Sequence, residues 1–329
     1  MRNIKLNLLK GLACIGVILI HAGFPGTFGQ TVLRISSYAV PIFFMIAGYY
    51  AFGKDTEVIK RRLVKIVKIF ICAYIIFFIW KISVAIKNNE VGLWFSWYYS
   101  WKTPIRMIVF CIVDFGFLLW YLIEMIEIYL FWILIVKKGK EDLALKALPV
   151  LWIIRLILIS VNGLIGFDKD WYMLFVIKGM PWFLIGYYLH SPKSEKIRNL
   201  KSGYHWLLAM AGCIIVVLPA IINSESDLFE FGYIPYAVGL FCLTLKNPEK
   251  SNCKLMEYIG EELSLYVYVF HLPVSGAYDL FVEIVGINKA SSFFMWTRPL
   301  AVILLTLVAS YVISKLSTFL KGKSRTTSS

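Results

Sequence analysis

Apolar stretches long enough to cross a lipid bilayer recur from one end of this 329-residue chain to the other. A helix rises about 1.5 Å per residue, so about 20 apolar residues cross the roughly 30 Å of hydrocarbon. We expect about ten such spans, centred near residues 12, 44, 74, 126, 155, 181, 214, 239, 268 and 308. The predicted fold is therefore an all-α integral membrane protein, a bundle of about ten transmembrane helices.

Composition and charge favour a membrane protein over a soluble or nucleic-acid-binding one. Only 16% of the residues are charged and 59% are hydrophobic, whereas about a quarter of a soluble domain is charged. The net charge of +14 comes from cations that gather in alternate connecting segments, while residues 224–230 are acidic and hold no cation. This asymmetry predicts a multi-pass protein of the cell membrane with both termini in the cytoplasm, and no nucleic-acid partner.

Two polar residues of the first span lie on the same helix face. Lys10 and His21 are eleven residues apart, which places them about 16 Å apart along a helix and within about 20° of each other around it. Burying a lysine in hydrocarbon costs on the order of 3 kcal/mol, so aligned polar groups in a span tend to line a cavity. We therefore expect a central cavity in the bundle. The alternative is that Lys10 anchors the span at the headgroups and His21 caps its far end.

The Lys10-x10-His21 spacing resembles a signature in the first span of the acyltransferase family 3 membrane proteins. Further segments resemble later elements of that family and follow in the same order. They are residues 41–50, in which Ala47 replaces the usual serine, 119–122, 182–189 and 264–273. The resemblance predicts one membrane domain over residues 1–320, followed by a short basic cytoplasmic tail at 321–329.

The resemblance implies the transfer of an acyl group, usually acetyl, from cytoplasmic acetyl-CoA to a hydroxyl. We expect the acceptor to be an extracytoplasmic or lipid-linked glycan, such as an envelope or capsular polysaccharide. Lys10 would then help to hold the donor and His21 would act at the transfer site. A neutral imidazole can take the proton from an attacking hydroxyl or can carry the acetyl group itself, and the sequence leaves both routes open.

The basic segment after the second span resembles a further element of the family. Arg62 and Lys65 lie one helical turn apart and would meet the phosphates of CoA, although the same charges also set topology. Lysine in place of arginine removes the two-pronged grip on a phosphate. Acetyl-CoA is expected as the donor substrate, and no metal is expected, because the six cysteines lack metal-ligand spacing and are typical of packing residues.

Ionisable residues within later spans are further candidates. Glu124 and Arg155 are expected at a similar depth, either as a structural ion pair or with Glu124 orienting His21 or the acceptor. His271, with Asp279 two turns further on, would bind the acceptor or assist transfer, or it has a structural role. His190 and His205 are expected in solvent.

A second hypothesis is a non-catalytic membrane carrier or amino-acid-binding module. The family-type membrane domain also occurs in the membrane-bound serine racemases, where it precedes a racemase domain. Nothing resembling a racemase follows Leu320. A carrier also has no evident need for an imidazole aligned with a cation near the cytoplasmic surface, so the Lys10 and His21 pattern favours the enzyme.

Overall fold

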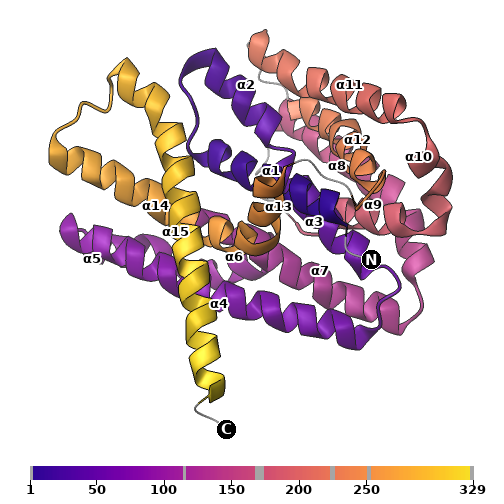
Figure 1. The fold of residues 1–329 in the computed structure, drawn as a ribbon, viewed down its shortest axis with the longest axis horizontal. Coiled ribbons are helices and arrows are strands. Elements are labelled where there is room, and N and C mark those ends of the chain that lie inside the picture. The colour runs from indigo at the N-terminus through magenta and orange to yellow at the C-terminus, as the bar shows by residue number, and fades with distance from the viewer. Residues whose placement is uncertain (1–2, 114–115, 167–173, 223–226, 250–252, 327–329) are drawn as a thin grey trace. The chain divides into compact units, whose positions relative to one another are not determined.

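The computed structural model describes residues 3–113, 116–166, 174–222, 227–249 and 253–326, and the regular elements in these ranges are all helical (Figure 1). The predicted all-α membrane fold is thereby confirmed. The chain forms two compact units. Unit 1 comprises Met1–Phe43 and Lys196–Ser329, and unit 2 comprises Phe44–Glu195.

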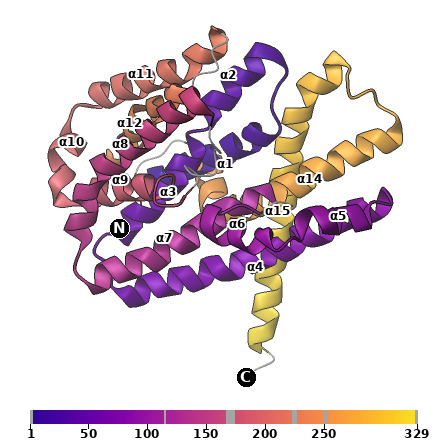
Figure 2. The same cartoon turned by 180° about the vertical axis from the view of Figure 1, so that it is seen from behind.

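Unit 1 combines the N-terminal helices with about the last two-fifths of the chain. Figure 2 shows α11 lying along α12, and α14 and α15 also pack against each other. The elements of this unit are α1 (Ile4–His21), α2 (Gly26–Ser36), the start of α3 (Ala39–Ala51), most of α10 (Glu195–Asn199), α11 (Ser202–Ile221), η4 (Asp227–Gly232), α12 (Tyr233–Leu245), α13 (Lys254–Tyr258), η5 (Ile259–Leu263), α14 (Ser264–Val285) and α15 (Ser292–Thr326).

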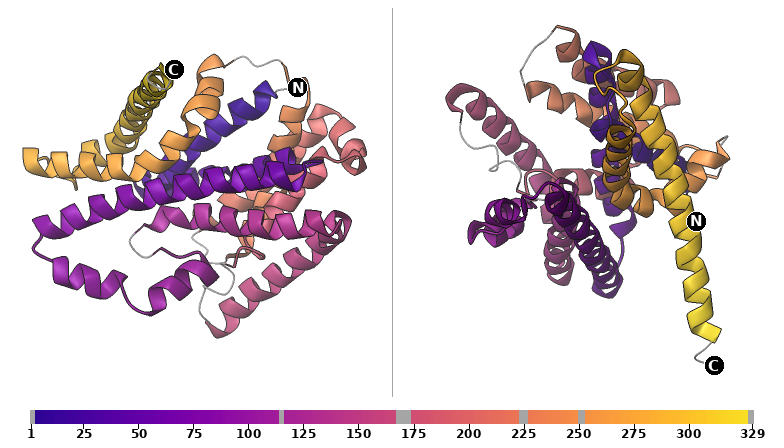
Figure 3. Two further views of the ribbon diagram at one scale, coloured as in Figure 1. Left: turned by 90° about the horizontal axis from the view of Figure 1, so that it is seen from below. Right: turned by 90° about the vertical axis from the view of Figure 1, so that its left-hand side faces the viewer.

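Unit 2 is built on a long helix, α4, with α7 running beside it (Figure 3). Its elements are the rest of α3, α4 (Thr56–Lys87), α5 (Val91–Tyr98), α6 (Lys102–Phe110), η1 (Phe117–Leu119), α7 (Trp120–Lys137), α8 (Glu141–Ile165), α9 (Met180–His190) and η3 (Pro192–Ser194). Asp55 begins α4 by accepting a hydrogen bond from the Val58 N–H at 2.8 Å, an N-cap that the sequence pattern Asp-Thr-Glu favours.

Seven helices in the described ranges are long and apolar enough to cross a membrane. They are Ile4–His21, Gly26–Ala51, Thr56–Lys87, Glu141–Asn162, Ser202–Ile221, Lys254–Val285 and Ser292–Phe319. The three other predicted spans are helices of a different kind. α9 has 11 residues and α12 has 13, so at 1.5 Å per residue they reach only about 16 and 20 Å. α7 has 18 residues but includes Glu124, Glu127 and Lys137.

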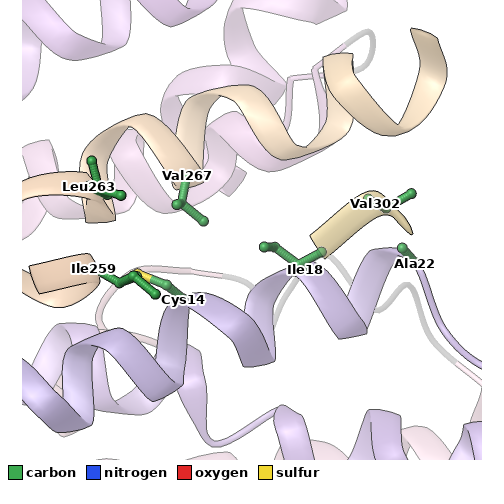
Figure 4. Close-up of a cluster of buried hydrophobic side chains, with 7 residues drawn as sticks. All are labelled: Cys14, Ile18, Ala22, Ile259, Leu263, Val267 and Val302. Carbon is green, nitrogen blue, oxygen red and sulfur yellow. The ribbon is translucent and has the colours of Figure 1, made fainter. Parts of the chain in front are cut away.

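The core of unit 1 joins four elements through a compact apolar cluster (Figure 4). Its members are Cys14, Ile18 and Ala22 of α1, Ile259 and Leu263 of η5, Val267 of α14, and Val302 of α15. All seven side chains are at most 3% exposed. Cys14 therefore acts as a small packing residue, as the sequence predicts for the cysteines.

Two glycines bring the helix backbones of unit 1 into direct contact. A Cβ on Gly11 of α1 would lie 2.0 Å from the Met256 carbonyl oxygen, and one on Gly260 would lie 1.9 Å from the Asn7 carbonyl oxygen. Gly260 belongs to η5, a π-helical turn, and such turns often accompany functional sites. Small residues at these two positions allow the close approach that membrane helices use for packing.

The aromatic segment at residues 87–115 forms two short helices, α5 and α6, and Asp114 lies outside the described residues. Trp97 and Trp101 are 73% and 76% exposed. Exposed tryptophans of this kind are typical of segments lying at a membrane surface. At the other end of the chain, α15 continues to Thr326, so residues 321–326 of the predicted tail are helical, and residues 327–329 lie outside the described ranges, as do residues 224–226 of the acidic loop.

Candidate functional site

The structure brings His21 and His271 together within unit 1. His21 is the last residue of α1, and His271 lies in α14, where it is only 1% exposed. Their ring centroids are 5.3 Å apart and the ring planes are inclined by 37°. The two helices are held together by the apolar cluster around Cys14 and Val267. Two histidines that the sequence singles out separately, 250 positions apart, thus form one imidazole pair.

The hydrogen bonds of His271 determine which of its nitrogens can act as a base. Its Nδ1 lies 2.9 Å from the Val267 carbonyl oxygen and 3.0 Å from the Tyr268 carbonyl oxygen. A carbonyl only accepts hydrogen bonds, so Nδ1 carries the proton and donates it. The lone pair of the neutral ring is then on Nε2, which is buried and has no hydrogen-bond partner in the structure. His271 is therefore oriented as an acceptor of a proton or a hydrogen bond.

Asp279 has a different partner from the one that the sequence suggests. Arg298 of α15 donates to both carboxylate oxygens of Asp279, at 2.7 and 2.6 Å, and to the Ser275 hydroxyl at 2.9 Å. Ser275 lies one turn beyond His271 on α14. This network fixes α14 to α15 next to the histidine pair. Arg298 is not among the predicted site residues, although an arginine within an apolar run is itself a signal of a polar partner.

The three predicted donor-binding cations have different environments. Lys10 lies on α1, partly buried, and its charge acts on Cys14 one turn away. Because α1 is one continuous helix, Lys10 and His21 do share a face, about 16 Å apart. In unit 2, Arg62 is partly buried and its side chain is hydrogen-bonded to Tyr129 of α7, whereas Lys65 is exposed.

Glu124 in unit 2 is fully buried, at 0% exposure, and neither carboxylate oxygen has a hydrogen-bond partner in the structure. The charges of Lys178 and Arg155 act on it through space. Arg155 Nη1 also reaches toward the Ile177 carbonyl oxygen at 3.5 Å, and the expected ion pair between Glu124 and Arg155 stays a prediction. Gly179 makes room for the carboxylate, since a Cβ there would lie 2.6 Å from Glu124 Oε1. A fully buried carboxylate with two cations nearby is typical of a functional position.

Cys111 is an exception to the prediction that the cysteines only pack. It lies outside the helices, and its thiol donates to Glu127 Oε2 at 3.1 Å. Burial, together with the nearby Glu124 and Glu127 charges, raises the pKa of Cys111, so the thiol stays protonated and can donate. Of the two carboxylates on α7, Glu127 therefore has the Cys111 thiol as a hydrogen-bond donor.

The expectation that His190 and His205 are solvated is wrong for His205, which is buried, while His190 is partly buried. His205 is 1% exposed, and His190 Nδ1 lies 2.6 Å from the Tyr49 carbonyl oxygen with its ring stacked on Tyr49 at 4.1 Å. Their places next to basic loops suggested solvent, but Tyr49 and Phe52 stack on the His190 ring, and the His205 side chain is buried.

Comparison with known proteins identifies the family. Residues 3–315 match the family defined by the acyltransferase domain, nearly the whole chain. The chain belongs to acyltransferase family 3. No curated protein and no solved structure matches it. The resemblance found in the sequence motifs is confirmed, and this chain is a multi-pass membrane acyltransferase.

Proposed function

We propose that this acyltransferase moves acetyl groups from cytoplasmic acetyl-CoA to a hydroxyl of an envelope or capsular polysaccharide at the cell membrane. The observation that carries the proposal is the imidazole pair of unit 1, with the buried Nε2 of His271 left without a partner beside His21. Acyl transfer to a hydroxyl needs a group that removes the hydroxyl proton, and a neutral imidazole does this near pH 7.

In the direct route, the proton of the acceptor hydroxyl passes to the protein and then to the leaving thiolate. As the acceptor oxygen attacks the thioester carbonyl carbon, its proton passes to an imidazole nitrogen of the pair. The tetrahedral intermediate then collapses, the C–S bond breaks, and the imidazolium returns the proton to the departing CoA thiolate. A second imidazole 5.3 Å away can accept hydrogen bonds from the acceptor and hold it in line for attack.

The donor is held by positive charge on the cytoplasmic side. Lys10 lies about 16 Å from His21 along α1, comparable to the reach of an extended pantetheine arm. The phosphates of CoA attract Lys10, Arg62 and Lys65. Arg62 is already fixed by Tyr129, which lowers the entropy lost when it grips a phosphate.

Glu124 is the third proposed catalytic-site residue. Its carboxylate would accept a hydrogen bond from a hydroxyl of the acceptor. Glu124→Gln keeps the shape of the side chain and removes this charge, so it should reduce transfer without lowering expression.

The test uses the purified protein in liposomes with labelled acetyl-CoA. We expect release of CoA thiol that depends on added polysaccharide, and O-acetyl groups on the glycan by mass analysis. His21→Ala should abolish both, while His190→Gln, a histidine outside the pair, should retain them. Release of CoA thiol at the parent rate by His21→Ala, or an unmodified glycan with the parent protein, contradicts the proposal. Label on the protein after a single turnover without glycan identifies the acyl-histidine route.

A further inference from the structure

Unit 1 contains a pocket away from the histidine pair that the proposed chemistry does not use. It has a volume of about 250 Å³ and lies between α2 and the η4–α12 segment. Its lining includes Gln30, Arg34, Phe229, Glu230 and Tyr233. This volume is below the usual range for a whole drug-sized ligand, so the pocket suits a single small group.

Arg34 supplies a cation inside the second apolar span. Its guanidinium carbon lies 3.9 Å from the centre of the Phe229 ring, which covers one face of the guanidinium plane. Its Nη1 is buried and has no hydrogen-bond partner in the structure. A guanidinium stacked in this way keeps its N–H groups at the edge for a ligand, and their fork matches a carboxylate or a phosphate.

The backbone around Arg34 is held firmly in place. The Tyr233 hydroxyl donates to the Arg34 carbonyl oxygen at 2.9 Å, which fastens α12 to α2. The Ser37 hydroxyl donates to the Leu33 carbonyl oxygen at 2.8 Å, where α2 ends. These hydrogen bonds hold the backbone of Arg34 in one position, as expected for a preorganised binding group.

Glu230 gives the same pocket a carboxylate. A simple anion would be repelled by it, whereas an anion with neighbouring hydroxyls can donate to Glu230 and accept from Arg34 at once. Phe229 and Tyr233 add apolar atoms to the lining, and these suit contact with the C–H groups of a sugar. Gln30, one helical turn before Arg34, adds an amide that both donates and accepts.

We propose that this pocket binds an acidic sugar unit of the acceptor glycan, its carboxylate or phosphate on Arg34 and a hydroxyl on Glu230. The proposal rests on the proposed function and adds that the acceptor is anionic. A zwitterionic amino acid would also meet one charge of each sign, but a small one such as serine has few C–H groups to contact the apolar part of the lining, so a sugar fits more of it.

Binding is measured on the purified full-length protein without acetyl-CoA, so the result does not depend on transfer. The probes are D-glucuronate, D-glucose 6-phosphate, neutral D-glucose and L-serine, each titrated by ligand-observed NMR. We expect one or both acidic sugars to bind at least tenfold more tightly than glucose, and serine to bind no better than glucose. The two acidic probes distinguish a carboxylate from a phosphate.

Variants locate the site. Arg34→Gln should bind the acidic sugar no better than glucose, Arg34→Lys should fall between, and Lys289→Gln, which removes a cation from an exposed loop pair, should bind as the parent does. Equal binding of acidic and neutral sugars by the parent, stronger binding of serine, or parent-like affinity in Arg34→Gln overturns the proposal. If Arg34→Gln does not fold, the relative affinities of the parent for the acidic sugars, glucose and serine still test the proposal. If the parent binds the acidic sugar but transfers no acetyl group to the glycan, only the proposed function is refuted and the pocket assignment stands.

Discussion

Replacing Gly11 with alanine should disrupt the contact that sets the separation of the two histidine-bearing helices. The new Cβ would lie 2.0 Å from the Met256 carbonyl oxygen, whereas ordinary contact begins at 3.4 Å. The backbones must therefore separate by about 1.4 Å, because a carbonyl in a helix cannot rotate out of the way. Overpacking of this kind costs about 1–3 kcal/mol. The cost for Gly11→Ala should be near the upper end, because the new Cβ meets backbone atoms of Met256 rather than a side chain that can move.

Gly11→Ala should affect stability and activity together. A loss of about 3 kcal/mol corresponds to a lower Tm on the order of 5 °C in a thermal melt of the detergent-solubilised protein. Since α1 carries His21 and η5 leads into the helix of His271, a shift of about 1 Å should also reduce acetyl transfer by about 100-fold.

Gly203→Ala is the matched control. Gly203 lies in the first turn of α11 and a Cβ there would have nothing within 4 Å, so the alanine should be neutral or slightly stabilising, by up to about 1 kcal/mol. If Gly11→Ala melts at the same temperature as Gly203→Ala and transfers acetyl at the parent rate, the argument from the α1 contact is refuted.

Three further predictions concern the donor, the topology and the ion pair. Lys10→Ala should weaken acetyl-CoA binding, Lys10→Arg should retain most of it, and the parent's affinity should fall as salt rises; parent-like affinity and salt dependence in Lys10→Ala would make Lys10 an interfacial anchor. Cysteine labelling should place residues 60–68 in the cytoplasm and residues 224–230 outside, and labelling of the second segment only after permeabilisation would exclude the predicted topology. Arg298→Gln should lower the free energy of unfolding by about 1–3 kcal/mol, against at most about 0.5 kcal/mol for the exposed Lys289→Gln, and equal melting curves would show that the pair contributes nothing.

The fold was predictable because hydrocarbon leaves few choices for an apolar run. Each predicted span centre lies in or next to a helix, since backbone polar groups in lipid must bond within their own segment. Helix length was less predictable. α9 ends at His190 after 11 residues, where the ring stacks on Tyr49 and Phe52, and this packing is not visible in the hydropathy of the segment.

The relative placement of two side chains was predictable only where both lie on the same helix. Lys10 and His21 are related by helix geometry alone, so the sequence was enough to place them. The partner of Asp279 is Arg298 on the next helix, and the partner of the Arg34 carbonyl is Tyr233, about 200 positions away. Contacts of this kind depend on which helix faces pack together, and a single sequence does not specify them.

The central claim is that the imidazole pair of α1 and α14 removes the acceptor proton. The most direct test is the single-turnover rate of acetyl transfer from acetyl-CoA to glycan by purified His271→Gln, with His205→Gln as a buried histidine outside the pair. We expect a rate at least about 100-fold below the parent for His271→Gln and a near-parent rate for His205→Gln, with both proteins folded by thermal melt. A folded His271→Gln that transfers acetyl within a few-fold of the parent rate would contradict it.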